Sequence, residues 1–371
     1  MDNIGLVTFS NTFDNYGQVL QALATQEYLK SRGHDVFLLR ENLSCWEKSI
    51  LHVKLIIKRL ILLMIGYERF KSLDNTRLKL TLQRVMEEAD DRRHPRYMEE
   101  FRKHHFKINV YSDDTIKRFN ITVLCTGSDQ IWTLANPFFF LRYGSPNLKR
   151  ISIAPSTGNR NISIEEKMKI AEWLPSYSFI TTREESGVKM CKSLGYYNVC
   201  KVLDPTFLLS ADDYLRFASS RKEVQPYLML YLLNAQTPIE YDEIVAFAQS
   251  NALEVKYVTG GRRYDNHEQI YATVQDWISL MYNAKYVITN SFHGMAFSVI
   301  FRKQFLVLPL VGGTKMTNER VYSLASELQL KDRVYKDNLN KVFDEIDYTI
   351  AGQKIYENRE IMDSKMNNVC L

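Results

Sequence analysis

The feature that most constrains the fold is an alternation of short apolar runs with stretches of helical spacing. Residues 4–9 form an apolar run, and residues 18–32 show the apolar spacing of a helix that Gly33 ends. Residues 36–39 form a second apolar run. A strand, a helix and a second strand in this order predict parallel pairing with a right-handed crossover.

The same alternation resumes after residue 120 and continues to residue 328. Strands are expected at residues 121–125, 150–154, 178–182, 199–203, 227–233, 255–258, 286–289 and 304–310. Helices are expected at residues 185–194, 239–252, 274–284, 293–301 and 319–328, and after a capping box at residues 163–166. Two such series predict the α/β fold class, with two Rossmann-like, doubly wound domains that face each other across a cleft.

The length agrees with this division, because 371 residues suit two domains of roughly 150–200 residues each. We predict an N-terminal domain over residues 1–210, a C-terminal domain over residues 211–345 and a C-terminal helix over residues 346–371. Residues 45–120 interrupt the alternation and are predicted to form a basic helical insertion in the first domain.

The first predicted helix of the insertion, residues 54–63, mixes leucine and isoleucine with lysine and arginine. A basic amphipathic helix of this kind could lie on an anionic membrane surface. It could equally pack against the domain while its basic side chains extend to solvent, and we favour this second interpretation.

Composition excludes several classes of protein. Hydrophobic residues make up 45% of the chain and charged residues 25%, which is typical of a globular protein rather than a disordered one. The net charge of +5 excludes a histone-like polycation and gives no indication of a nucleic-acid partner. No secretory signal precedes the first strand, and the longest apolar run, residues 60–65, is far shorter than the roughly 20 residues of a membrane span. We therefore expect a cytoplasmic protein, or one that is peripheral on the cytoplasmic face of the membrane.

The five cysteines are scattered and form no C-x-x-C pair, so neither a disulfide framework nor a structural zinc site is expected. The sequence also lacks H-E-x-x-H, G-x-S-x-G and any acidic cluster at metal spacing. We predict no metal and no cofactor.

Polar residues that directly follow the predicted strands are the candidates for chemistry, because ligands bind beyond the carboxyl ends of parallel strands. The candidates are Asn15, Tyr16, Gly17, Ser128, Asp129, Gln130, Ser156, Thr157, Arg183, Asp204, Gly260, Gly261, Arg262, Arg263, Asn290, Ser291, Phe292, His293 and Gly294.

His293 stands in the first turn of a predicted helix, after a strand that ends at Thr289. Free N–H groups and the helix dipole make such a turn an anion site, and a histidine beside a bound anion suits a general acid. Gly294 allows a ligand or another backbone to approach closely. From these residues alone, a histidine that only caps the turn remains the slightly favoured alternative.

The other candidates each have a structural alternative. Arg183 could bind a carboxylate or a phosphate in the cleft, or it could pair with Glu184 or Glu185 on the surface. Asp129 could be a base or could cap a following helix. The loop with Arg262 lacks a G-x-G-x-x-G or Walker pattern, so support for a nucleotide site is weak.

Six segments in series resemble the polysaccharide pyruvyl transferase family. They are residues 15–22 (NYGQVLQA), 126–132 (TGSDQIW), 183–186 (REES), 203–206 (LDPT), 289–294 (TNSFHG) and 318–320 (NER). The resemblance implies a two-domain fold similar to that of GT-B glycosyltransferases. It also implies transfer of a pyruvyl group from phosphoenolpyruvate to two hydroxyls of a sugar, which forms a cyclic ketal without a cofactor.

By the same resemblance, His293 matches the candidate general acid of the family and Arg183 its donor-binding arginine. Several members have an arginine two residues before this histidine, where this chain has Ser291. Donor binding should then depend on the helix N-terminus and on other cations, for which we select Arg320, Lys315 and Arg262. Asp129 is the second catalytic candidate. Asn15, Tyr16, Gly17, Ser128, Gln130, Ser291 and Gly294 complete the predicted substrate-binding set.

Two other functions share this architecture. One is a GT-B-like glycosyltransferase that uses a sugar nucleotide, although no clear acidic residue for a ribose is found in the second domain. The other is a non-catalytic glycan-binding scaffold. The partners expected for a pyruvyltransferase are phosphoenolpyruvate and a glycan acceptor, and the basic insertion is compatible with an acceptor linked to polyprenyl diphosphate at the membrane.

Overall fold

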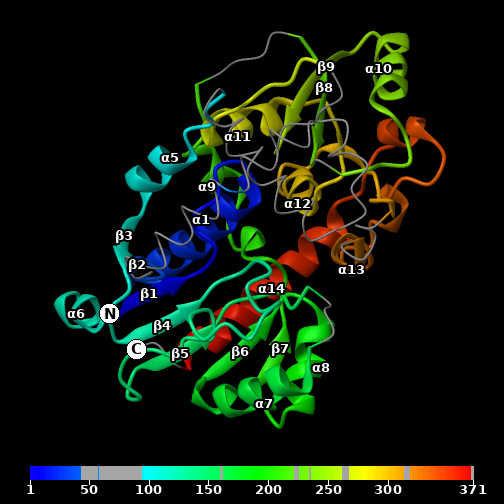
Figure 1. Cartoon of the computed structure of the whole chain (residues 1–371). Coiled ribbons are helices and arrows are strands. Elements are labelled where there is room, and N and C mark those ends of the chain that lie inside the picture. Colours follow the sequence, from blue (N-terminus) through cyan, green and yellow to red (C-terminus); the bar gives the residue numbers. More distant parts are fainter. Residues whose placement is uncertain are drawn as a thin grey trace.

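A computed structural model describes residues 1–42, 57, 94–158, 162–220, 225–233, 235–260, 267–312 and 318–368. Two parallel sheets dominate the molecule (Figure 1). The first has seven strands in the order β3-β2-β1-β4-β5-β6-β7. They are β1 (Asn3–Val7), β2 (Asp35–Arg40), β3 (Lys107–Val110), β4 (Val123–Thr126), β5 (Lys149–Ser152), β6 (Phe179–Thr182) and β7 (Val199–Lys201).

The second sheet has four parallel strands in the order β11-β10-β8-β9. They are β8 (Tyr227–Leu232), β9 (Glu254–Thr259), β10 (Tyr286–Thr289) and β11 (Gln304–Val307). All six residues of β8 are buried, as expected for a central strand covered on both faces. The α/β fold class with two parallel sheets is therefore confirmed.

Helices connect the strands of both sheets. In and beside the first sheet these are α1 (Tyr16–Ser31), α5 (Met98–His105), α6 (Asp113–Arg118), α7 (Ile164–Trp173) and α8 (Glu185–Ser193). In the second half of the chain they are α9 (Ala211–Leu215), α10 (Tyr241–Ser250), α11 (Val274–Asn283), α12 (Phe292–Ile300), α13 (Glu319–Glu327) and α14 (Thr349–Asn367). The capping box predicted for α7 is present, with Ser163 and Glu166 bonding each other's backbone N–H groups.

Helix α1 joins the two domains through a continuous apolar core. The Tyr16 ring stacks on Trp277 of α11 with 5.4 Å between ring centres, and the Tyr16 hydroxyl donates a hydrogen bond to the carbonyl of Ala272. Both aromatic side chains are fully buried. This contact holds the N-terminus of α1, which follows β1, against the second domain.

Helix α14 returns from the second half of the chain to the first domain (Figure 1). Asp363 of α14 accepts hydrogen bonds from Tyr28 and Arg32, and Asn358 accepts one from the Leu203 backbone. The predicted C-terminal helix therefore forms and packs across the domain interface. The predicted division near residue 210 falls in the connection between β7 and β8.

The prediction of a purely helical insertion over residues 45–120 is wrong in its last part. Residues 107–110 form β3, which pairs with β2 at the edge of the first sheet. This strand has only four residues, two of them apolar, and lies between helices α5 and α6. The run is too short for its alternation to be recognised in the sequence. The proposed basic amphipathic helix at residues 54–63 lies outside the described residues, apart from Ile57.

None of the helices in the described part of the chain is long and apolar enough to cross a membrane. The cysteines with described positions, Cys125, Cys191 and Cys200, form no disulfide bond with one another.

Candidate active site

His293 is held at the start of α12 by a tightly bonded turn. Thr289 Oγ1 accepts a hydrogen bond from Ser291 N at 3.1 Å, and Ser291 Oγ accepts one from Gly294 N at 3.3 Å. Asn290 bonds both backbone groups of Leu233, which anchors the turn to the end of β8. The turn therefore presents His293, only 7% exposed, toward the first domain.

Gly17 provides the surface on which the His293 ring rests. A Cβ atom at position 17 would lie 2.0 Å from His293 Nδ1, so no residue with a side chain fits here without displacing the ring. Gly17 belongs to the first turn of α1, whose N-cap Asn15 accepts a hydrogen bond from Gln18 N. The predicted ligand Gly17 is thus a packing partner of the predicted acid.

Arg183 follows β6 and is almost fully buried. Its Nε donates to Glu184 at 2.9 Å and its Nη1 donates to Asp204 at 2.8 Å. Burial lowers the pKa of Arg183, but the two carboxylates outweigh it and raise this pKa well above the usual range. Arg183 does pair with Glu184, as the structural alternative proposed, yet in the interior rather than on the surface. Its Nη2 has no hydrogen-bond partner among the described residues.

Asp204 connects the groups around Arg183 to His293. Besides Arg183, its Oδ2 accepts a hydrogen bond from Ser128 Oγ at 3.1 Å and lies 3.8 Å from His293 Nε2. Its Oδ1 accepts bonds from Thr206 N and Oγ1. Burial would raise the pKa of Asp204, but His293, Arg183 and the Thr206 N–H hold it well below its ordinary value. The carboxylate is therefore ionised across the whole physiological range.

Arg320 of α13 brings a second cation to the same place. Phe292 lies beside both arginines, with its ring centre 4.8 Å from the guanidinium carbon of Arg183 and 5.8 Å from that of Arg320. Burial and the nearby Arg183 lower the pKa of Arg320 to about 10. Its Nε is buried without a hydrogen-bond partner in the described structure. The other two predicted cations, Lys315 and Arg262, lie outside the described residues.

Asp129 has a left-handed backbone, with φ of 79°, which is strained for a residue other than glycine. Its Oδ1 accepts a hydrogen bond from Gln130 N, and no helix begins within residues 130–148. The alternative that Asp129 caps a following helix is therefore wrong. Its charge acts on both Arg183 and Arg320.

The remaining predicted residues have structural contacts. Tyr16 lies in the core between the domains, Ser291 caps α12, and the space above Gly294 is filled by Thr289 Oγ1, 2.2 Å from the place of an added Cβ. Gln130 accepts a hydrogen bond from Thr133 through its backbone carbonyl. Their roles as substrate ligands stay predictions.

Asp204 and Phe292 were among the candidates after the strands but received no specific role, and Glu184 was considered only as a surface partner of Arg183. The signal for Asp204 was available, because it directly follows a strand at the same sheet edge as Arg183. What the sequence does not contain is the distance from Asp204 to His293, which depends on how the two domains meet.

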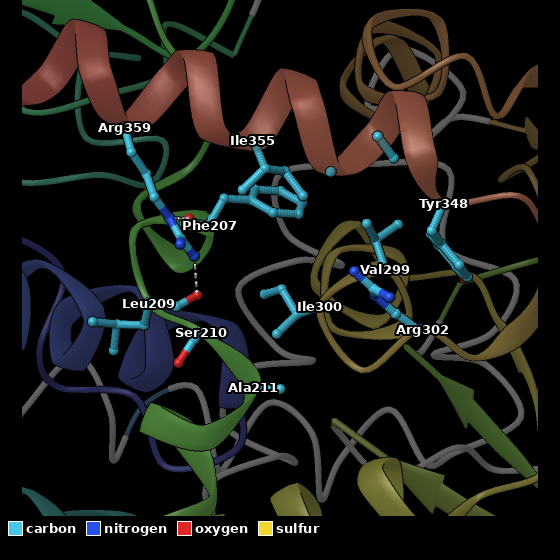
Figure 2. A pocket seen from close by; sticks show the side chains of 12 residues that line it. Phe207, Leu209, Ser210, Ala211, Val299, Ile300, Arg302, Tyr348, Ile355 and Arg359 are labelled. Carbon is cyan, nitrogen blue, oxygen red and sulfur yellow. Dashed lines mark hydrogen bonds between the residues drawn. The ribbon is translucent and has the colours of Figure 1, made fainter.

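Two pockets can be compared. Arg183, Asp204, Phe292 and Arg320 line a small pocket closed on one side by the ion pair between Lys201 and Glu327. A more open pocket lies under α14 at the far end of α12 and includes Ile300, Arg302 and Arg359 (Figure 2). In it Arg359 donates to backbone carbonyls, and none of its lining residues was predicted as a site residue. We therefore place the candidate site at the first pocket, which two arginines line and whose Asp204 lies 3.8 Å from His293 Nε2.

A family model for polysaccharide pyruvyl transferases matches residues 15–310. The chain belongs to this family. The matched range contains Arg183, Asp204 and His293, whereas Arg320 and Glu327 lie beyond it. Membership makes the protein a transferase, and the resemblance seen in the sequence motifs is confirmed. A comparison with curated proteins finds no match.

Solved structures with a similar arrangement come from enzymes of other families. MurG from Acinetobacter baumannii is 9% identical, with 99% of this chain and 91% of that chain covered and a TM-score of 0.42. UDP-GlcNAc 2-epimerase from Neisseria meningitidis is 10% identical, with 99% and 94% covered and a TM-score of 0.46. A glycosyltransferase from Rickettsia africae is 10% identical, with 99% of both chains covered and a TM-score of 0.42. At these values the likeness carries no information about substrate.

Proposed function

We propose that this protein transfers the pyruvyl group of phosphoenolpyruvate to two hydroxyls of a sugar, as a cyclic ketal, in a bacterial cell-surface polysaccharide such as a capsule or exopolysaccharide, or in its precursor. One observation carries the proposal. Arg183 Nη2 and Arg320 Nε are buried beside Phe292, and neither has a hydrogen-bond partner among the described residues. Buried donors of this kind cost stability unless a ligand satisfies them.

Phosphoenolpyruvate suits these donors because it carries a phosphate and a carboxylate a short distance apart. Arg183 is fixed by Glu184 and Asp204, so it can offer its free Nη2 without rearranging. Arg320 is repelled by Arg183, and an anion between the two guanidinium groups would relieve that repulsion. The N-terminus of α12 adds a favourable dipole.

The reaction requires a proton at the methylene carbon of the donor. His293 gives this proton, and the resulting oxocarbenium-like carbon is attacked by the first sugar hydroxyl, which loses its own proton to a base. Asp129 is our candidate for that base. Inorganic phosphate then leaves, and the second hydroxyl attacks as the ketal closes, returning its proton to His293. The methylene carbon has become a methyl group, and one proton leaves with phosphate.

Sequence alone supports the remaining parts of the proposal. We propose a cytoplasmic enzyme without a cofactor, whose acceptor is a glycan that can be linked to polyprenyl diphosphate. The basic stretch within residues 45–93, which would contact the membrane surface, lies outside the described residues apart from Ile57.

The test is thermal unfolding with and without phosphoenolpyruvate, beside a panel of sugar nucleotides. A ligand at a hundredfold excess over its Kd stabilises the folded state by about 2.7 kcal/mol. We expect stabilisation by phosphoenolpyruvate, and its loss in Arg183→Lys and Arg320→Ala. Arg183→Lys keeps a cation beside the two carboxylates while removing the free Nη2. The matched control is Arg216→Ala, which removes an exposed arginine directly after α9.

Stabilisation by a sugar nucleotide alone would assign the protein to the glycosyltransferases. Stabilisation by phosphoenolpyruvate that survives in both arginine variants would place the donor elsewhere on the protein.

A further inference from the structure

We infer that Asp204 is a positioning residue that couples the donor-binding arginine of the first domain to the histidine of the second. The inference rests on the proposed function. One oxygen, Oδ2, lies 2.8 Å from Arg183 Nη1 and 3.8 Å from His293 Nε2. Arg183 follows β6 of the first sheet, and His293 follows β10 of the second. A single carboxylate oxygen thus meets both halves of the site.

Asp204 is fixed firmly enough for this role. The side chain is fully buried, and Thr206 binds its Oδ1 through both N–H and hydroxyl. Ser128 donates to Oδ2 from the end of β4. Because these donors stabilise the charged form, the carboxylate stays ionised and cannot turn away from His293 without losing several hydrogen bonds.

His293 needs an orienting partner, and Asp204 is the carboxylate placed to supply it. Within the described residues, Asp204 is the only acid within 4.0 Å of a His293 ring nitrogen. Nε2 is buried and makes no hydrogen bond there, while the Nδ1 side of the ring rests on Gly17. A hydrogen bond would form if the ring moved so that Nε2 came about 1 Å closer to Oδ2. A carboxylate in this position fixes which ring nitrogen carries the proton.

The shared oxygen also makes His293 sensitive to the donor. An anion bound at Arg183 Nη2 takes up part of the positive charge that attracts Oδ2, so Oδ2 becomes a stronger acceptor for Nε2 while Arg183 stays in place. Binding of the donor in the first domain would in this way orient the acid of the second domain.

Glu184 offers a matched control within the same cluster. It also pairs with Arg183, at 2.9 Å, and is nearly as buried as Asp204. Its side chain pairs with Arg183, its backbone carbonyl accepts hydrogen bonds from Thr182 and Gly187, and it lies more than 4.0 Å from the His293 ring nitrogens. Glu184→Gln therefore removes a carboxylate that pairs with Arg183 and leaves the surroundings of His293 unchanged. Asp204→Asn removes a carboxylate that lies beside both Arg183 and His293.

The experiment follows the ring nitrogens of His293 by NMR in protein labelled with ¹⁵N-histidine, with the signals assigned by their loss in His293→Ala. We expect Asp204→Asn to shift these signals and Glu184→Gln to leave them in place. On addition of phosphoenolpyruvate, the His293 signals should move in the wild type and in Glu184→Gln, and should move less in Asp204→Asn, where only the direct effect of the donor remains. Thermal unfolding reports donor binding separately in each variant.

Unchanged His293 signals in folded Asp204→Asn would overturn the inference, and so would an equal change in Glu184→Gln. If Asp204→Asn does not fold, Ser128→Ala removes one donor from Oδ2 and should move the same signals; no movement would again overturn it. If phosphoenolpyruvate binds neither the wild type nor any variant, the proposed function fails. The His293 signals of Asp204→Asn and Glu184→Gln, compared without ligand, still decide the role of Asp204.

Discussion

The turn after β6 and the turn after β10 share the same local structure but hold different functional side chains. Each strand ends in a threonine, and each following helix has a glycine five residues later that packs on that threonine: Gly187 on Thr182 and Gly294 on Thr289. The first turn carries Arg183, neutralised by two carboxylates. The second carries His293, whose Nε2 has no hydrogen-bond partner in the described structure.

The difference shows that the same turn can support either anion binding or proton transfer. Ion pairs with Glu184 and Asp204 give Arg183 a permanent charge in a fixed place, as anion binding needs. His293 is held by packing, on Gly17, rather than by ion pairs, and so it keeps a ring nitrogen available for proton transfer. The fixed charge and the transferable proton are kept in separate domains that meet at Asp204.

The largest expected effect is that of removing the transferable proton. His293→Ala should lower transfer by about 100- to 10,000-fold, the range for loss of a general acid, while donor binding is retained. The measurement is phosphate release from phosphoenolpyruvate with a panel of methyl glycosides that carry neighbouring hydroxyls. Unfolding temperature serves as the control for folding. Near-native turnover in this variant would remove His293 from catalysis and erase the difference between the two turns.

A smaller loss should follow when His293 is kept but displaced. In Gly17→Ala the new Cβ would lie 2.0 Å from Nδ1, so the ring must move. We expect a loss of turnover of about 100-fold, as for a misplaced catalytic group, and a loss of stability of about 1–3 kcal/mol from overpacking.

Two variants sharpen this prediction. In Gly17→Ala combined with His293→Ala the clash disappears, so the stability lost in Gly17→Ala should be largely recovered. Gly352→Ala, in α14, adds a Cβ that meets no atom within 4 Å and should leave turnover unchanged. If Gly17→Ala is as active as Gly352→Ala, packing on Gly17 does not place His293.

The same contrast explains what sequence could predict. Strands such as residues 227–232 were found because every residue is apolar or aromatic, which is the pattern of a covered parallel strand. The edge strand β3 was missed because Lys107 and Val110 are exposed, Ile108 and Asn109 are only half-buried, and four residues give only two repeats of the period. The local sequence pattern predicts a strand that is buried on both faces well, and it predicts a short, half-exposed edge strand poorly.

For the site, sequence predicted positions but not partnerships. His293, Arg183 and Ser128 were selected because they follow parallel strands, and the structure brings all three to Asp204. That Gly17 supports the His293 ring, or that Tyr16 is core rather than ligand, depends on contacts across 256 or more residues of sequence, such as the bond from Tyr16 to Ala272. No local pattern encodes a contact of that range.

The smallest expected effect is a difference in turnover between variants of Gly187 and Gly294, the glycines that pack on the strand-ending threonines. Gly187→Ala and Gly294→Ala should each lower stability by about 1–3 kcal/mol, because the added methyl group meets the threonine side chain at 2.8 Å and 2.2 Å respectively. Only Gly294→Ala should also lower turnover, by about tenfold, because a shift of α12 moves a histidine that nothing else in the described structure holds by a hydrogen bond. In Gly187→Ala the two ion pairs keep Arg183 in place, so donor binding, followed by thermal unfolding with phosphoenolpyruvate, should persist. Equal losses of turnover in the two variants would mean that both turns depend on packing alone, and that the carboxylates around Arg183 neutralise its charge without fixing its position.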